Sequence, residues 1–233
     1  MTTWGQVWER KGLGATLQPT LSELLQRDGF DSGGGNISEA VWQRYVDWVL
    51  EKVDLPAARS VLEVGSGAGA FLYALMERGS QVTGTDYSAS LIAAARAAMP
   101  GGRFFVHEAR HIAEIDGSFD VVMANSVFQY FPDQPYAHDV LQGMLAKATS
   151  TVAILDVYDA AQREEMEAVR RAGLTEAAYT EKYRGLAHQY YERAWFEAAG
   201  GASGCEVEVV DQPKWLCDVS KCRFSVFIRK KSP

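Results

Sequence analysis

Apolar and polar residues follow two different rhythms along the chain. In the first 58 residues the apolar positions recur at steps of three and four, which is the period of an amphipathic helix. This pattern predicts helices over residues 4–10, 21–27 and 38–53. The glycine-rich stretch 32–36 predicts a turn that we interpret as a hinge. The chain therefore opens with a helical segment.

From residue 60 onward, short apolar runs alternate with helical windows. The runs predict strands over 61–64, 81–85, 103–107, 119–123 and 152–157. The windows between them predict helices over 68–78, 88–99 and 134–148. Such alternation is typical of parallel strands joined by right-handed crossovers, with helices on both faces of the sheet.

The last third of the chain breaks this alternation. It predicts helices over 160–172 and 176–199, the second interrupted near Gly185, and then strands over 205–210 and 223–228. No helix separates the last two strands, and their polar and apolar residues alternate as in an antiparallel edge pair. We therefore predict an α/β fold with a seven-stranded, mostly parallel, doubly wound sheet and an antiparallel final strand.

Composition and charge narrow the function classes. The 233 residues are 47% hydrophobic and 23% charged, which fits one globular domain. The net charge of −7 argues against nucleic acid or an anionic membrane as a partner, because such binding depends on Lys and Arg. No signal peptide or membrane-spanning stretch is visible, so we expect a soluble, cytoplasmic protein. Three late cysteines predict reduced thiols and no metal site.

The strongest local signal is a glycine-rich loop between a predicted strand and a predicted helix. It reads Glu63-Val64-Gly65-Ser66-Gly67-Ala68-Gly69-Ala70. Glycines there allow a tight turn and close approach of a ligand, next to a helix N-terminus. The spacing also satisfies the G-x-G-x-x-A dinucleotide pattern, and Asp86 follows where an NAD protein binds ribose. The loop by itself leaves several adenosine cofactors open.

Further features favour one family. Glu63 ends the strand with an acid, the third glycine gives E-x-G-x-G-x-G spacing, and residues 119–133 read FDVVMANSVFQYFPD. With these motifs the sequence resembles the class I (Rossmann-like) S-adenosylmethionine-dependent methyltransferases of the small-molecule type. The resemblance is specific over about residues 60–133. It implies S-adenosylmethionine as the cofactor.

The resemblance also implies roles for the loop residues. Gly65, Gly67 and Gly69 would line the methionine portion of the cofactor. Glu63 would orient the loop and help to bind the amino group.

Six further residues would follow the adenosine portion: Asp86, Tyr87, Glu108, Ala109, Asn125 and Ser126. The resemblance implies that Asp86 accepts both ribose hydroxyls and that Tyr87 packs against adenosine. The pair at 108–109 would border the adenine, with glutamate in place of the commoner aspartate, and the pair at 125–126 would lie beneath the cofactor. Each also has a structural alternative; Asp86, for example, could simply cap the next helix.

Candidate catalytic residues come from two places: His188, Tyr191 and Tyr130. On the predicted helix over 176–199, His188, Tyr191 and Trp195 would share one face. Histidine titrates near neutral pH and so suits a base, although a histidine among aromatic residues is also a common packing residue. Tyr130 follows the fourth strand and could hydrogen-bond an acceptor.

These interpretations give a single domain over residues 1–233. It comprises a helical N-terminal cap (1–58), a cofactor-binding core (59–158), a helical insertion or lid over the acceptor (159–204) and a final strand pair (205–233). Aromatic residues of the cap are expected to bury against the sheet, with some covering the acceptor.

The predicted function is methyl transfer from S-adenosylmethionine to an O or N atom of a small-molecule metabolite. We hypothesise specialised metabolism as its setting, and expect no nucleic-acid or membrane partner. A homodimer is left open. The alternatives are an NAD(P)-dependent oxidoreductase and a non-catalytic S-adenosylmethionine-binding partner protein.

Overall fold

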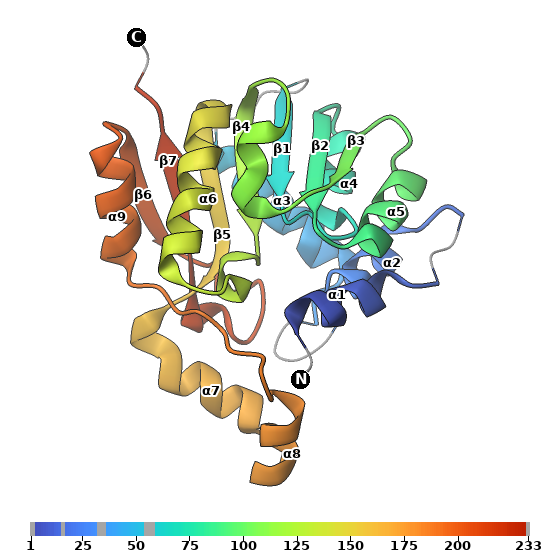
Figure 1. The fold of residues 1–233 in the computed structure, drawn as a ribbon, viewed down its shortest axis with the longest axis vertical. Helices are drawn as coiled ribbons and strands as arrows, with labels where there is room; N and C mark the ends of the chain where they lie inside the picture. The colour runs from blue at the N-terminus through green and yellow to red at the C-terminus, as the bar shows by residue number, and fades with distance from the viewer. Residues whose placement is uncertain (1–2, 15–16, 32–35, 54–58, 232–233) are drawn as a thin grey trace.

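A computed structural model describes residues 3–14, 17–31, 36–53 and 59–231. These residues form a seven-stranded sheet in the order β3-β2-β1-β4-β5-β7-β6 (Figure 1). The strands are β1 (Ser60–Val64), β2 (Gln81–Asp86), β3 (Arg103–Val106), β4 (Phe119–Asn125), β5 (Ala148–Tyr158), β6 (Glu206–Asp211) and β7 (Arg223–Arg229). The predicted hinge over 32–36 falls mainly on residues outside the described ranges.

The direction of the strands matches the prediction. The first five strands pair in parallel, whereas β7 runs antiparallel to both β5 and β6. The strand order reverses between β1 and β4, and in open α/β sheets ligands bind beside the carboxyl ends of the strands at such a point. The predicted fold class is confirmed.

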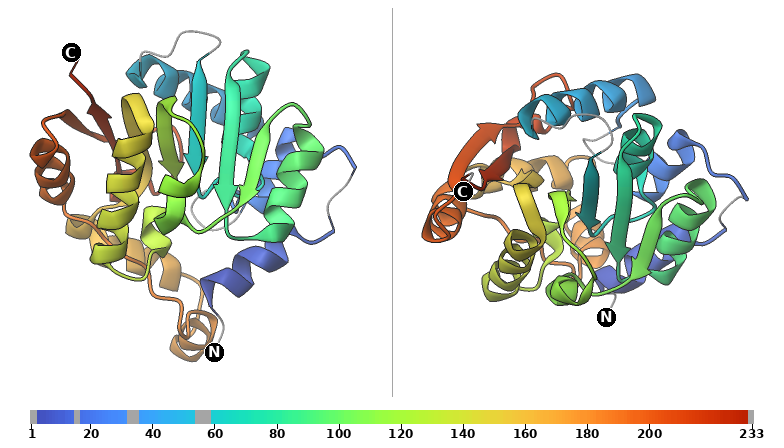
Figure 2. Two further views of the ribbon diagram at one scale, coloured as in Figure 1. Left: turned by 45° about the horizontal axis from the view of Figure 1, so that its top comes forward. Right: turned by 90° about the horizontal axis from the view of Figure 1, so that it is seen from above.

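Helices cover both faces of the sheet. One face packs against α2 (Leu21–Arg27), α3 (Glu39–Val53), α4 (Ala70–Glu77) and α5 (Ala89–Ala98). The other packs against the 3-10 helix η1 (Ala109–Glu114), α6 (Gln134–Lys147) and α9 (Arg193–Ala202). Figure 2 shows α3 and α6 on opposite sides of the strands. None of the described helices is long and apolar enough to cross a membrane.

The three predicted N-terminal helices are confirmed, and the first lies apart from the sheet faces. Figure 1 shows α1 (Trp4–Gly12) beyond the lower, carboxyl ends of the parallel strands. It begins with a capping box between Thr3 and Gln6, which satisfies backbone N–H groups of its first turn. Glu9 fixes its place, because the carboxylate accepts hydrogen bonds from the Ser88 hydroxyl at 2.7 Å and the Ser90 amide at 3.4 Å.

The predicted interruption near Gly185 is confirmed, but the break in the helix over 176–199 is longer than the sequence indicates. The α8 helix (Glu176–Lys182) ends early, α9 begins only at Arg193, and residues 183–192 run as a loop. Gly185 takes a positive φ of 79°, and the Tyr191 amide donates to the Tyr158 carbonyl at 2.9 Å instead of to a helical partner. Tertiary hydrogen bonds thus replace the helical ones, so His188, Tyr191 and Trp195 do not share a helix face.

Candidate functional site

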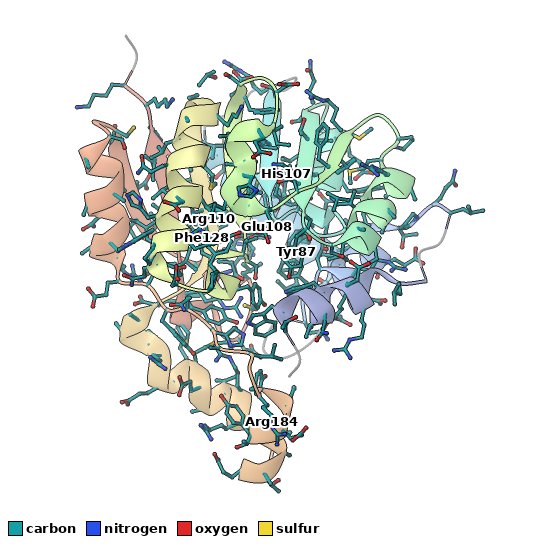
Figure 3. All side chains as sticks on the ribbon, in the orientation of Figure 1. Tyr87, His107, Glu108, Arg110, Phe128 and Arg184 are labelled. Atoms are coloured by element: carbon teal, nitrogen blue, oxygen red, sulfur yellow. The ribbon has the colours of Figure 1, made fainter. Side chains whose placement is uncertain are left out.

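A cavity of about 390 Å³ lies at the carboxyl ends of β1, β2 and β4. Its walls come from the glycine loop, the residues that follow β2, β3 and β4, and the segment that includes α1 and Asp28. In Figure 3 the labelled side chains of Tyr87 and Glu108 lie in this central region, between the strand ends and α1. This size falls in the range of pockets that hold small ligands.

The glycine loop forms one wall because its backbone takes conformations that other residues avoid. Gly65 and Gly67 have φ values of 68° and 56° and line the cavity. A Cβ at Gly65 would approach the Val127 side chain to 2.7 Å, and one at Gly67 would overlap the Asp28 carboxylate. Gly69 lies behind the wall as the N-cap of α4, where a Cβ would approach Met99. Two of the three predicted glycines therefore face the cavity.

Asp86 ends β2 beside this loop and is only 8% exposed. Its carboxylate accepts hydrogen bonds from the Gly67 amide at 3.0 Å and the Ser88 amide at 2.8 Å. Burial raises its pKa to about 6. Each carboxylate oxygen has two lone pairs, so Asp86 can hold the loop and still accept further hydrogen bonds.

Glu63, at the end of β1, is 3% exposed and lines the cavity. Burial, with the neighbouring Asp28 and Asp86 carboxylates, raises its pKa well above the usual range. Its Oε2 has no hydrogen-bond partner in the described residues, and neither has the buried hydroxyl of Ser66. Buried polar atoms are usually satisfied, so this pair indicates that the wall is built for a ligand with hydrogen-bond donors.

Asp28 is a site residue that the sequence patterns do not predict. It is the C-cap of α2, and its carboxylate reaches the glycine loop. Oδ1 accepts a hydrogen bond from the Ala68 amide at 2.6 Å, and Oδ2 accepts one from the Ala70 amide at 2.9 Å. Burial raises its pKa to about 7. An acid at a helix C-terminus opposes the helix dipole, and this anomaly is the one sequence signal that could have found it.

The residues that follow β2 and β3 form another part of the cavity wall. Tyr87, Glu108 and Ala109 line the same cavity, and Tyr87 is 41% exposed. The Tyr136 hydroxyl donates to Glu108 Oε2 at 2.6 Å and so fixes that carboxylate. Burial raises the pKa of Tyr87, which keeps its hydroxyl neutral.

Asn125 and Ser126, at the end of β4, also line the cavity. Asn125 Oδ1 accepts a hydrogen bond from the Tyr45 hydroxyl at 3.3 Å. Ser126 has a positive φ of 58°, which is uncommon for a residue with a side chain, and its hydroxyl accepts from Gln129 Nε2 at 2.8 Å. Strained backbone of this kind is often found at binding sites.

Aromatic rings close the side of the cavity opposite the sheet. Trp4 and Trp8 of α1 meet the Tyr130 ring edge-on, at centroid distances of 4.7 and 5.3 Å. All three line the cavity. Trp4 Nε1 also donates to the Ala187 carbonyl at 2.9 Å, which joins α1 to the loop over residues 183–192.

His188 lies behind this aromatic wall and does not line the cavity. Its ring packs 4.7 Å from Trp4 and stacks on Tyr158 at 5.5 Å. Burial, with the Arg170 and Arg223 guanidinium groups, lowers its pKa to about 3. At neutral pH the ring is therefore uncharged and a weak base.

Tyr191 is also remote from the cavity. Its side chain is completely buried in the core cluster around Phe128 and Phe196, and its hydroxyl donates to the Phe128 carbonyl at 2.9 Å. Of the three predicted catalytic residues, the structure brings only Tyr130 to the predicted cofactor residues.

The lining of the cavity is rich in acidic side chains. Four carboxylates line it: Asp28, Glu63, Asp86 and Glu108. No Lys or Arg side chain is among the described residues that line it. No group of three His, Cys, Asp or Glu side chains in the described ranges is arranged to hold a metal ion. This field favours an organic ligand that carries positive charge.

Comparison with known proteins identifies the family. Residues 61–148 match the family described as "Methyltransferase domain". This stretch of the chain therefore carries a methyltransferase domain. A trans-aconitate 2-methyltransferase from Variovorax paradoxus is 31% identical to it over 152 residues, which cover 61% of this chain and 57% of that enzyme. The chain thus spans just over half the length of this relative.

Solved structures share the fold of the methyltransferase domain at low sequence identity. Phosphoethanolamine N-methyltransferase 1 from Haemonchus contortus, in complex with phosphoethanolamine and S-adenosylhomocysteine, superposes with a TM-score of 0.64 at 14% identity, covering 97% of this chain and 48% of that one. Magnesium protoporphyrin IX methyltransferase from Synechocystis PCC 6803, with bound S-adenosylhomocysteine, gives 0.56 at 16%, covering 97% and 92%. These structures agree with the predicted fold class.

Proposed function

We propose that this protein transfers a methyl group from S-adenosylmethionine to an O or N atom of a small-molecule acceptor. The observation that carries the proposal is the charge of the cavity, with four lining carboxylates and no described Lys or Arg. S-adenosylmethionine has a positive sulfonium and a positive ammonium group. NAD(P) has a negative diphosphate, which this cavity would repel. When bound, S-adenosylmethionine supplies a methyl group on a positively charged sulfur.

The described residues fit this cofactor. Asp86 would hold the ribose hydroxyls with the lone pairs that the loop does not use. Glu63, whose Oε2 lacks a partner, would accept a hydrogen bond from the ammonium group. Tyr87 and Glu108 would border the adenosine from the strand ends.

The acceptor would meet the aromatic side of the cavity. Methyl transfer of this type is an in-line displacement, so the protein mainly aligns the reactants and excludes water. Trp4, Trp8 and Tyr130 supply a rigid apolar wall for both tasks. Burial raises the pKa of Tyr130, so its hydroxyl would donate a hydrogen bond to the acceptor rather than remove its proton.

The net charge of the chain and the names of the compared enzymes both support a small-molecule acceptor. The net charge of −7 disfavours nucleic acids. The compared enzymes are named for trans-aconitate, phosphoethanolamine and magnesium protoporphyrin IX, none of which is a macromolecule. O- and N-methylation both remain within the proposal, and the setting in specialised metabolism stays a hypothesis.

Thermal melting with three ligands tests the cofactor. A ligand that binds only the folded state raises the melting temperature. S-adenosylmethionine and S-adenosylhomocysteine should each raise it by several degrees and NADH should not. A shift with NADH alone would support the oxidoreductase instead.

Two variants make this test specific to the ribose contact. Asp86→Ala should abolish the shift with S-adenosylhomocysteine, because it removes the carboxylate at the end of β2. Asp116→Ala, which changes an exposed turn residue, should keep the shift. Transfer of a radiolabelled methyl group to members of a metabolite library would then separate an enzyme from a non-catalytic binding protein.

A further inference from the structure

Asp28 occupies a place that usually belongs to a ligand. The backbone amides at the start of a helix, next to a glycine loop, form a site for anions. Here the Asp28 carboxylate fills that place, with hydrogen bonds from the Ala68 and Ala70 amides at 2.6 and 2.9 Å. A free phosphate or carboxylate would have to displace it. The start of α4 therefore presents negative charge to the cavity instead of positive charge.

The Asp28 carboxylate still has unused capacity. Each of its oxygens accepts one backbone hydrogen bond, and each has a second lone pair. Asp28 itself lines the cavity, so a donor on a ligand can reach it.

A second observation points to a ligand with hydrogen-bond donors beside Asp28. Glu63 is 3% exposed and lines the same cavity, and its Oε2 has no partner in the described residues. The two carboxylates are close enough for Asp28 to raise the pKa of Glu63. The positive charge of Lys11 lowers the pKa of Asp28 slightly, but the Lys11 ammonium group forms its ion pair with the Asp31 carboxylate, at 3.3 Å. A ligand ammonium group would balance the charge of both carboxylates.

We propose that Asp28 binds the ammonium group of the cofactor's methionine portion and so ties α2 to the cofactor. This inference rests on the proposed function, because it assigns a contact to S-adenosylmethionine. It makes the N-terminal segment part of the cofactor site. On the sequence alone that segment was expected to cover the acceptor.

Binding measurements on Asp28→Asn test the contact. Asparagine has nearly the same shape and keeps one oxygen for the loop amides, but it loses the charge. A hydrogen bond between charged groups is worth about 1.5–3 kcal/mol, which corresponds to roughly a tenfold to hundredfold change in affinity. We therefore expect calorimetry to show an S-adenosylhomocysteine affinity at least about tenfold weaker than that of the unchanged protein.

A second ligand separates contact from simple loop support. 5′-Methylthioadenosine shares the adenosine and sulfur but lacks the amino-acid portion. Its affinity should change by less than about threefold in Asp28→Asn. An equal loss for both ligands would show that Asp28 only shapes the loop, and no loss for either would also overturn the inference.

A matched variant controls for charge alone. Asp31→Asn removes a neighbouring exposed carboxylate that pairs with Lys11 outside the cavity. The affinities of Asp31→Asn for S-adenosylhomocysteine and for 5′-methylthioadenosine should both stay within about twofold of those of the unchanged protein. A tenfold loss in this variant would mean that the overall negative charge near the cavity, and not a contact with Asp28, controls binding. Failure of the unchanged protein to bind S-adenosylhomocysteine would instead contradict the proposed function, so the two failures are distinguishable.

Discussion

His188 and Asp28 show how surroundings set the chemistry of a single residue. His188 sits among the rings of Trp4 and Tyr158 and near two arginines, so its charged form is disfavoured and its pKa falls to about 3. Asp28 sits beside two other carboxylates, and burial raises its pKa to about 7. The histidine therefore stays neutral at the pH where the aspartate changes its charge.

We predict that the His188 ring does not titrate near neutral pH. In a ¹⁵N-labelled sample, NMR should show that the His188 ring stays neutral at least down to pH 5. The chain has four histidines, and His188→Phe, which keeps a flat ring in the same place, should remove only the silent signal. A midpoint near 6.5 for that signal would restore His188 as a candidate base.

Sequence patterns indicated the cavity residues at the strand ends, but not Asp28 or the positions of His188 and Tyr191. Asp86 and Glu63 could be found because they lie at fixed distances from the glycines, on strands whose ends must meet. Asp28 comes from α2, and its approach to the loop depends on how that helix packs, which no local spacing encodes. His188 and Tyr191 were assigned to the face of a helix that does not form, so their predicted grouping had no physical basis.

At the level of elements, the aromatic wall of the cavity depends on the contact between α1 and the loop over residues 183–192, which we call the joint. Trp4 links them through its hydrogen bond to the Ala187 carbonyl and its edge-on contact with His188. The Gln189 amide continues the joint by donating to the Gln129 carbonyl at 2.9 Å, next to Tyr130. The aromatic wall is therefore built from three segments that are far apart in the sequence.

We predict that Trp4→Leu loosens this joint without unfolding the sheet. The variant loses one hydrogen bond and two ring contacts, so local opening of the loop should become roughly tenfold more frequent. Trypsin should then cleave faster after Lys182 or Arg184, while far-UV circular dichroism stays unchanged. Mass spectrometry of the fragments identifies the site.

Trp215→Leu is the matched control, because Trp215 packs under Arg44 and against the core cluster that includes α3. Its cleavage rate in the same loop should equal that of the unchanged protein. Equal acceleration in both variants would mean that general destabilisation, and not the Trp4 joint, controls the loop.

The elements themselves were predicted well where their pattern is local. Alternating apolar runs and helical windows identify the strands and helices between residues 60 and 158, and the observed parallel order follows from the crossover rule. The stretch over 183–192 is rich in aromatic residues and reads as helical, yet Gly185 and the backbone pairing of Tyr191 with β5 draw it out of the helix. Such tertiary pairing lies beyond what a local pattern can indicate.

For the whole molecule, the buried carboxylates couple the cavity to folding. Asp28, Asp86 and Glu63 all have pKa values raised above those of the unfolded chain. For each of these groups, the folded state binds more protons than the unfolded state at any pH between the unfolded pKa and the folded pKa. Stability from these groups is therefore greatest at low pH and is lost as pH rises through the folded pKa values.

We predict that the ligand-free protein becomes less stable between pH 6.5 and 8. His188 has the opposite effect on stability, but only at lower pH. Its folded pKa is about 3, so its contribution increases stability as pH rises to about 6.5 and is constant above that pH. The melting temperature should fall by several degrees, because 1 kcal/mol corresponds to about 2–4 °C in a domain of this size. Differential scanning calorimetry at constant ionic strength measures it.

The variant Asp28→Asn measures how much Asp28 contributes to this fall in melting temperature with pH. The variant cannot ionise at position 28, so its melting temperature should fall less steeply than that of the unchanged protein over the same pH range. Parallel curves for the two proteins would show that Asp28 is already ionised below pH 6.5.

One consequence follows from where the cavity's residues lie in the sequence. Every described residue that lines it falls between Thr3 and Tyr136, although the chain continues through β5, the loop over 183–192 and the final strand pair. Later sequence touches the cavity only indirectly, through contacts such as that of His188 with Tyr130. Substitutions in the C-terminal 97 residues therefore leave every described residue that lines the cavity unchanged. Because Trp4, Trp8 and Tyr130, the side chains proposed to meet the acceptor, also lie in this first part of the chain, a change of acceptor would have to arise in the same stretch that is proposed to hold the methyl donor.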